Sequence, residues 1–230
     1  MSQDLVRNLD SVRRRIADAA RAADREPDDV TLIAVSKTHA AAVVDEAVAA
    51  GAVDLGENRV QEAVAKKPEV RPARWHLIGP LQRNKAKAAL DTFDVIHTVD
   101  RPEIVDRLHF LLEQHWPERV VDVLLEINVG DEPQKAGVAP DDAPALLGSA
   151  LDSDRLQVRG VMAIPPYTAD AESSRRFFRK LREVRDRLQD SSGRPLPELS
   201  MGMSHDFEVA VAEGATMVRV GTAIFGPRGS

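Results

Sequence analysis

The sequence predicts an α/β protein of the (β/α)8 barrel class, with an extra helix in front of the first strand. Two observations lead to this prediction. Short apolar, β-branched runs recur eight times along the 230 residues, and seven stretches with helical spacing separate them. Such alternation implies parallel strands joined by helical crossovers, and eight strands close a barrel of this class. A doubly wound open sheet is the alternative that the same alternation allows.

The chain begins with a predicted amphipathic helix over residues 3–24. Its apolar side chains recur at intervals of four and three residues, which places them on one helical face. They are Leu5, Leu9, Val12, Ile16, Ala19 and Ala23. Pro27 ends this helical region, because proline cannot continue a helix at an interior position.

Strands and helices then alternate to the end of the chain. The predicted strands cover residues 31–36, 52–58, 74–80, 94–100, 120–129, 158–165, 198–203 and 216–222. The predicted helices cover residues 40–50, 58–67, 82–90, 102–115, 140–150, 170–190 and 204–213. The Pro- and Gly-rich stretch 132–144 is predicted to be a loop at one rim. Because no linker or repeat stands out, we expect residues 1–230 to form a single domain.

Composition and charge narrow the function classes. Lys and Arg alternate with Asp and Glu, and the net charge of −6 leaves no basic stripe for nucleic acid. The absence of cysteine excludes disulfides, thiolate metal ligands and a cysteine nucleophile, and it fits a cytoplasmic protein. No window of about 18 apolar residues exists, so we expect no membrane span. We also expect a monomer, because no additional apolar stripe is evident.

Polar residues close most of the predicted strands. In a (β/α)8 barrel the carboxyl ends of the strands form the active site, so these residues should meet in one cavity. They are Lys37, Asn58, His76, Thr98, Asn128, Ser200, Ser204, Arg219, Gly221 and Thr222.

Lys37 ends the first strand in the stretch "TLIAVSKTHA". One interpretation is a solvated lysine at the start of a loop. The other is a nucleophilic amine, because strand alternation places Ile33, Val35 and Lys37 on the same face. Desolvation among aliphatic side chains would lower the pKa of Lys37 and allow a Schiff base with an aldehyde or ketone.

The carboxyl-terminal portion combines small polar residues with an arginine. Ser204, Gly221 and Thr222 suit a phosphate site in the loops after strands 7 and 8, although ordinary turns and caps use the same residues. Arg219 would point into the barrel, where it needs either a ligand acceptor or a carboxylate. Together with Lys37, these residues describe a site for an aldehyde that carries a phosphate. Pyridoxal 5′-phosphate (PLP) is the most economical candidate.

Six segments resemble the pyridoxal phosphate homeostasis proteins, from about residue 30 to residue 226. They read "AVSKTH", "GENRVQEA", "WHLIGPLQRNK", "EINVGDEPQKAGV", "GVMAIPP" and "SMGMSHDFEVAVAEGATMVRVGTAIFG". The resemblance implies a barrel like the N-terminal domain of bacterial alanine racemase, with PLP bound to Lys37 as an internal aldimine. It also implies that Arg219 faces the pyridine nitrogen and that Asn58 lies beside the ring. The residues implied around the phosphate are Ser200, Ser204, Gly221 and Thr222.

The resemblance implies a PLP carrier or buffer in vitamin B6 homeostasis, without strong catalysis of its own. Apo forms of PLP-dependent enzymes would receive the cofactor. A weak amino-acid racemase is one alternative, although it needs a second acid/base group, for which Tyr167, His205 and His39 are the candidates. A class I aldolase that uses Lys37 is another. His76 is a candidate site residue that fits a satisfied core histidine equally well.

Overall fold

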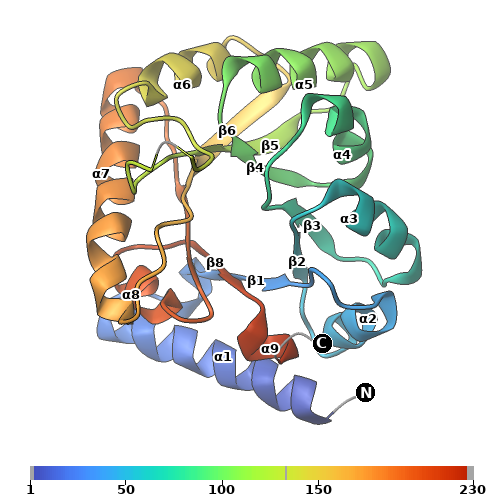
Figure 1. Ribbon diagram of the computed structural model, residues 1–230, viewed down its shortest axis with the longest axis vertical. Coiled ribbons are helices and arrows are strands. Elements are labelled where there is room, and N and C mark those ends of the chain that lie inside the picture. Colours follow the sequence, from blue (N-terminus) through green and yellow to red (C-terminus); the bar gives the residue numbers. More distant parts are fainter. Residues whose placement is uncertain (1–2, 133, 227–230) are drawn as a thin grey trace.

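The computed structural model describes residues 3–132 and 134–226, in which eight parallel strands close a barrel (Figure 1). Each strand pairs with its neighbour in the chain, and the last pairs with the first. The (β/α)8 prediction is confirmed, and closure excludes the open sheet. The strands are Thr31–Val35 (β1), Asp54–Glu57 (β2), Arg74–Leu77 (β3), Val95–Val99 (β4), Val121–Glu126 (β5), Leu156–Met162 (β6), Glu198–Met203 (β7) and Met217–Val220 (β8).

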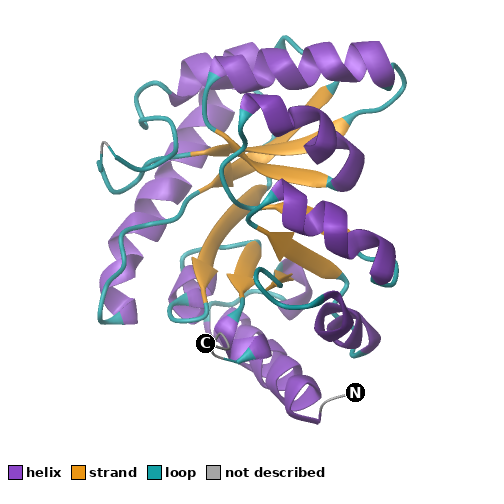
Figure 2. Ribbon diagram, turned by 45° about the vertical axis from the view of Figure 1, so that its right-hand side comes forward, coloured by secondary structure: helices purple, strands orange, loops and turns teal. Residues whose placement is uncertain are grey.

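The crossover helices lie outside the barrel, as Figure 2 shows. They are Ala41–Ala49 (α2), Val60–Lys66 (α3), Ala86–Thr92 (α4), Pro102–His115 (α5), Ala143–Leu151 (α6), Arg175–Ser192 (α7) and Phe207–Ala212 (α8). Each overlaps its predicted range. Helices α4 and α7 begin later than predicted, because the 3-10 turns Arg83–Lys85 and Ala171–Ser174 precede them. Among the helices of the described residues, none has the length and apolar character that crossing a membrane requires.

Helix α1, Gln3–Ala22, lies along the flank of the barrel against α8 and α2 (Figure 1). Its apolar face is buried and joins the same cluster as the outer face of the sheet. The extra N-terminal helix is therefore confirmed. A short helix that was not predicted, Thr222–Phe225 (α9), follows β8 directly and also packs against α1.

Apolar side chains fill two separate regions. The larger cluster lies between the sheet and the helices, and its fully buried aromatic members include Trp75, Phe93 and Phe178. Burial of each large apolar side chain contributes about 1.5–3 kcal/mol. A small cluster of Val95, Leu124 and Met162 is distinct from it. The strand alternation places this small cluster inside the barrel, so much of the interior is left to other residue types.

Strand β5 is shorter than its apolar run, which continues to Val129. The strand ends at Glu126, because Ile127 keeps a single hydrogen bond to β6, from its N–H to the Met162 carbonyl at 2.8 Å, and the chain then pairs with the following loop. Ile127 forms an isolated bridge with Val138, and the Asn128 N–H donates to the Val138 carbonyl at 2.9 Å. This pairing ties the predicted rim loop to the barrel.

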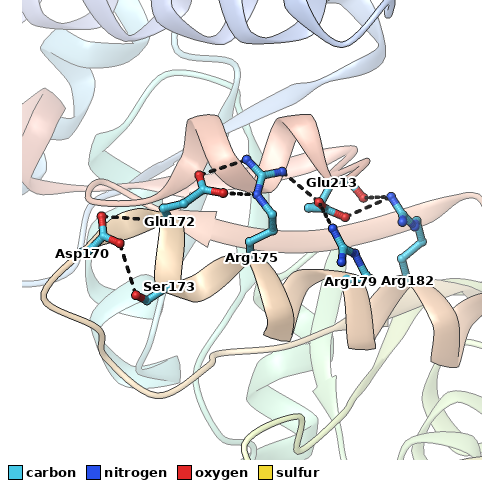
Figure 3. A network of polar contacts seen from close by, with 7 residues as sticks. All are labelled: Asp170, Glu172, Ser173, Arg175, Arg179, Arg182 and Glu213. Atoms are coloured by element: carbon cyan, nitrogen blue, oxygen red, sulfur yellow. Dashed lines mark hydrogen bonds and ion pairs between the residues drawn. The ribbon is translucent and has the colours of Figure 1, made fainter.

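An ion network joins α7 to the end of α8 (Figure 3). Arg175, Arg179 and Arg182 project from successive turns of α7 toward Glu213. Glu213 Oε1 lies 2.8 Å from Arg175 Nη1 and 3.2 Å from Arg179 Nη2, and Oε2 lies 3.2 Å from Arg182 Nη1. Glu172 binds the other side of Arg175. We call these five residues the outer network.

Candidate functional site

Lys37 lies two residues after the end of β1 and is half-buried. Strand β1 pairs with β8, with Ala34 opposite Val220, so the segments after the two strands emerge side by side. The ring of His39 stacks on Phe225 of α9, with centroids 4.8 Å apart. The loop that carries Lys37 is thereby held against the carboxyl-terminal segment.

The backbone on both sides of Lys37 is anchored by side chains of α3. Lys66 Nζ donates to the Ser36 carbonyl at 2.9 Å, and the Thr38 N–H donates to Glu62 Oε2 at 3.1 Å. Thr38 has φ of +69°, an uncommon conformation for a β-branched residue, with a typical strain of about 1–3 kcal/mol. Such strain persists where the surroundings over-determine it, as these two anchors do here.

A buried ion pair between Glu57 and Lys66 also holds this segment in place. Glu57 is fully buried, and its Oε1 lies 2.7 Å from Lys66 Nζ. The Ser36 hydroxyl donates to the same oxygen at 2.7 Å. Burial raises the pKa of Glu57, and the hydrogen bonds from Lys66 and Ser36 act in the opposite direction. The pair thus fixes the end of β1 at the residue before Lys37.

Ser204, Gly221 and Thr222 meet where β8 passes into α9. The N–H groups of Gly221 and Ala223 donate to Ser204 Oγ at 3.1 and 3.4 Å. A Cβ on Gly221 would lie 3.3 Å from the Val35 carbonyl oxygen, so a larger residue would press on the strand that leads to Lys37. The structure therefore brings these three predicted residues together beside β1.

Arg219 points into the barrel, as predicted. It is only 3% exposed, and its Nη2 donates to the Ala163 carbonyl at 2.8 Å. Its Nη1 donates to Ser200 Oγ at 2.6 Å. Burial lowers the pKa of Arg219 to about 10, while Glu126 and Asp206 act to raise it. The side chain consequently remains a cation at neutral pH.

Ser200 lies with Arg219 and not with Ser204. It is fully buried on β7, and besides accepting from Arg219 its hydroxyl lies 3.0 Å from His97 Nδ1. Its hydroxyl is thus engaged inside the barrel. The assignment of Ser200 to the phosphate was a prediction from the family resemblance, and this geometry favours a role behind Arg219.

The other strand-end residues lie in different environments. Asn58 is half-buried and lines a cavity of about 410 Å³ with residues of the β2 and β3 loops. Thr98 donates to the Gly79 carbonyl at 2.9 Å, and Asn128 Nδ2 donates to the Glu132 carbonyl at 2.8 Å, so these two contact backbone. His76 is a fully buried, hydrogen-bonded histidine.

The sequence patterns did not lead us to predict two polar residues inside the barrel, His97 and Glu126. Both are buried, and Glu126 Oε2 has no hydrogen-bond partner within the described residues. Burial, aided by the charge of Asp100 and opposed by Arg219 and Arg101, raises the pKa of Glu126 to about 7. Strict alternation within "DVIHTVD" and "VLLEI" was the signal that would have placed both residues inward.

The fold and the site define a (β/α)8 barrel with a lysine after its first strand and a buried arginine on its last. The profile described as "Alanine racemase, N-terminal domain" matches residues 7–229. The chain is 45% identical over 226 residues to the pyridoxal phosphate homeostasis protein of Pseudomonas aeruginosa, covering 97% of this chain and 96% of that protein. The protein of that name from Escherichia coli K12 is 39% identical over 234 residues, with 98% and 97% covered. The chain therefore belongs to the pyridoxal phosphate homeostasis protein family.

Solved structures agree with this assignment. PipY of Synechococcus elongatus, determined with PLP bound, has a TM-score of 0.80 and 42% identity, and the match covers 92% of this chain and all of that one. The D-threonine aldolase of Filomicrobium marinum has a TM-score of 0.74 at 20% identity, covering 95% of this chain and 61% of that one. At that level of identity the likeness extends to the fold alone.

Proposed function

We propose that this chain binds PLP as a Schiff base on Lys37 and acts as a PLP carrier or buffer in vitamin B6 homeostasis. The observation that carries the proposal is the convergence of Lys37, Arg219 and the Ser204–Gly221 contact beside the adjoining ends of β1 and β8. The family relationship, with PLP bound to a relative that is 42% identical, supports the choice of cofactor. Residues 1–230 would act as one PLP-binding domain.

The residues present fit this cofactor. An amine that condenses with an aldehyde is supplied by Lys37, with loss of one water. Ser204 and Thr222 supply hydroxyl groups that a phosphate accepts from, and Gly221 joins them, with its N–H donating to Ser204 Oγ. Asn58 would lie beside the ring. When bound, PLP supplies an electron sink whose strength depends on the protonation of its pyridine nitrogen.

The charge of Arg219 favours storage of the cofactor over its use in catalysis. A cationic guanidinium facing the pyridine nitrogen disfavours protonation there by like-charge repulsion. The ring is then a poor electron sink, which suits storage and release better than strong catalysis. We further propose a monomer in the cytoplasm that passes PLP to apo forms of PLP-dependent enzymes.

Absorbance tests this proposal directly. Purified protein incubated with PLP is expected to be yellow, and borohydride reduction followed by mass spectrometry should place the added mass on Lys37. Lys37→Ala should lose the absorbance and still fold, because the side chain lies after the strand. Lys180→Ala, which removes an ion pair with Asp131 on the outside, is the matched control and should keep the colour. Added mass on another lysine, or none, would contradict the proposal.

The same preparation separates the alternative functions. A racemase would exchange the α-hydrogen of an amino acid with deuterium from the solvent at a useful rate, and a carrier would not. Tyr167, the tyrosine considered for that role, is 80% exposed and lies against the ring of His205, with centroids 5.6 Å apart. An aldolase would be colourless as purified and would cleave a sugar-phosphate ketone.

A further inference from the structure

A series of hydrogen-bonded side chains runs through the barrel interior from β2 to β8. His76 Nε2 lies 2.8 Å from Asp54 Oδ1, and His76 Nδ1 lies 2.9 Å from His97 Nε2. His97 Nδ1 lies 3.0 Å from Ser200 Oγ, which lies 2.6 Å from Arg219 Nη1. We call these five residues the interior chain. Because β4 and β7 are not neighbours in the closed sheet, the contact between His97 and Ser200 spans the barrel.

The chemistry of the two ends, together with the need of the Ser200 O–H for an acceptor, assigns the direction of each bond. The Asp54 carboxylate only accepts, so His76 donates from Nε2, and the Arg219 guanidinium only donates, so Ser200 Oγ accepts from it. Ser200 can then donate its own O–H to His97 Nδ1, and His97 donates from Nε2 to His76 Nδ1. In this pattern each histidine carries one proton, on Nε2, and every ring nitrogen has a partner. The reverse pattern, in which His97 donates to Ser200, would leave the Ser200 O–H without an acceptor among the described residues.

Burial supports the neutral state of the central ring. His97 is fully buried, and desolvation lowers its pKa well below the usual 6.5, with further lowering by the charge of Arg219. A ring that stays neutral keeps one nitrogen as an acceptor, and the Ser200 O–H makes this nitrogen Nδ1. Ser200 is then held with its hydroxyl hydrogen toward His97 and its lone pairs toward Arg219.

Stability alone does not account for this arrangement. Barrel interiors are usually filled by branched aliphatic side chains, and replacing buried polar groups by well-packed apolar ones is often neutral or stabilising. His76, His97 and Ser200 are nevertheless fully buried inside this barrel. Their hydrogen bonds form a continuous series that ends at Arg219, and this fits a role in orienting its guanidinium.

Asp54 anchors the far end of the interior chain. It begins β2 and lines a cavity of about 480 Å³ at the floor of the barrel, together with Leu9, Arg13 and Ile16 of α1. Its side chain is 13% exposed, so water can solvate the carboxylate. A carboxylate at the floor and a cation at the other end polarise the intervening bonds in the same direction, which strengthens each of them.

We propose that the interior chain is a positioning device, in which four residues orient the guanidinium of Arg219 toward the pyridine nitrogen of the cofactor. That Arg219 faces the pyridine nitrogen rests on the proposed function, whereas the inference that these four residues orient Arg219 does not. Ser200 is the member that couples Arg219 to the histidines. Without it, Arg219 retains the Ala163 carbonyl as its other hydrogen-bond acceptor, and one contact leaves the plane of the guanidinium free to rotate.

The first test uses the cofactor-free wild-type protein. Long-range ¹H–¹⁵N NMR of ¹⁵N-histidine-labelled protein is expected to show His76 and His97 as neutral rings with slowly exchanging Nε2–H protons. Single His→Gln variants assign the resonances. A proton on Nδ1 of His97, or a doubly protonated ring at pH 7, would overturn the proposal. This readout requires neither PLP binding nor a variant that folds poorly.

The second test measures the protonation of the pyridine nitrogen in the PLP-bound protein. The ¹⁵N resonance of pyridine-labelled PLP should report an unprotonated nitrogen in the wild type and a partly protonated one in Ser200→Ala. The dissociation constant of PLP should rise roughly tenfold in this variant, as the loss of a charge-assisted hydrogen bond predicts. Ser200→Thr, which keeps the hydroxyl, should restore the nitrogen signal.

Ser153→Ala is the matched control. Ser153 Oγ lies 2.8 Å from His109 Nδ1 in a serine–histidine pair outside the barrel, so its loss should leave the nitrogen signal unchanged. An unchanged signal in Ser200→Ala would overturn the positioning role. If the histidine tautomers are as expected but the wild type takes up no PLP, the proposed function fails while the orientation of Arg219 stands.

Discussion

The interior chain and the outer network are both polar clusters, but they are built in opposite ways. The outer network draws three arginines from one helix, at positions 175, 179 and 182, and their side chains are 32–53% exposed around Glu213. The interior chain takes one residue from each of five strands, and its two histidines are fully buried. Sequence-local spacing suffices for the first, whereas the second exists only once the barrel has closed.

The two clusters also differ in what they do for the protein. The outer network stabilises the fold, whereas the interior chain is proposed to position Arg219. Burial would raise the pKa of Glu213, but hydrogen bonds from Arg175 and Arg179 more than offset this, so its pKa is lowered and the carboxylate stays charged. Solvent screens the half-exposed arginines around the buried Glu213, and the role of these pairs is to hold α7 against α8. The interior chain is shielded from solvent, so each of its bonds is stronger and the loss of a partner is more damaging.

The largest effect on stability is expected from His97→Ala. The substitution leaves a cavity inside the barrel and removes partners of both His76 and Ser200, so the free energy of unfolding should fall by about 3–5 kcal/mol. Urea denaturation followed by circular dichroism measures this. His109→Ala, at a half-exposed histidine on α5, is the control and should lose less than about 1 kcal/mol. Equal losses in the two variants would remove the distinction between interior and outer sites.

Glu126 is expected to make stability depend on pH. Its folded pKa of about 7 lies above the ordinary value of 4.5, so the folded state holds the proton more tightly. Between pH 4.5 and 7 the native state therefore binds more protons than the unfolded state, and this group's contribution falls as pH rises through that window. The difference between wild type and Glu126→Gln should change by about 1–3 kcal/mol.

Denaturation of the cofactor-free protein at pH 5, 6, 7 and 8 measures the effect of Glu126. The control is Glu183→Gln, which replaces an exposed carboxylate on α7 and should give a smaller change across this range. A flat difference for Glu126→Gln would show that Glu126 is ionised throughout this range and that its burial is offset by the neighbouring arginines.

The smallest effect is expected from Glu213→Gln in the outer network. The amide keeps the shape of the side chain but removes the charge that three half-exposed arginines share, so the loss should be about 1–2 kcal/mol. It should shrink in high salt, because solvent-exposed charges are screened. Arg179→Ala, which removes the most exposed arginine, should lose less than about 1 kcal/mol. A loss that is independent of salt would place the outer network in the same class as the interior chain.

The architecture could be predicted from the sequence because each element has its own local pattern. Helix α5 lies at the predicted bounds of 102–115, since Pro102 starts it and its apolar side chains keep a helical period. Strand β5 was predicted too long, because an apolar run does not reveal that Ile127 pairs with Val138 of the loop. Helix α9 was missed because it is too short to show a period.

Part of the candidate site could also be predicted from the sequence. Lys37, Arg219, Ser204, Gly221 and Thr222 were predicted from their places at strand ends, and the structure gathers them beside β1 and β8. Their binding roles remain predictions. The connection of Ser200 to His97 could not be predicted, because 103 residues separate the two and the contact crosses the barrel.

The sequence by itself determined the alternation of strands and helices, the inward face of each strand and the lysine at the end of the first. These follow from side-chain periodicity and backbone preference, which act between residues close in the chain. Only the tertiary structure decided which inward-facing polar residues become partners. Closure of the barrel removes water from their surroundings, and each buried donor and acceptor must then find a protein partner.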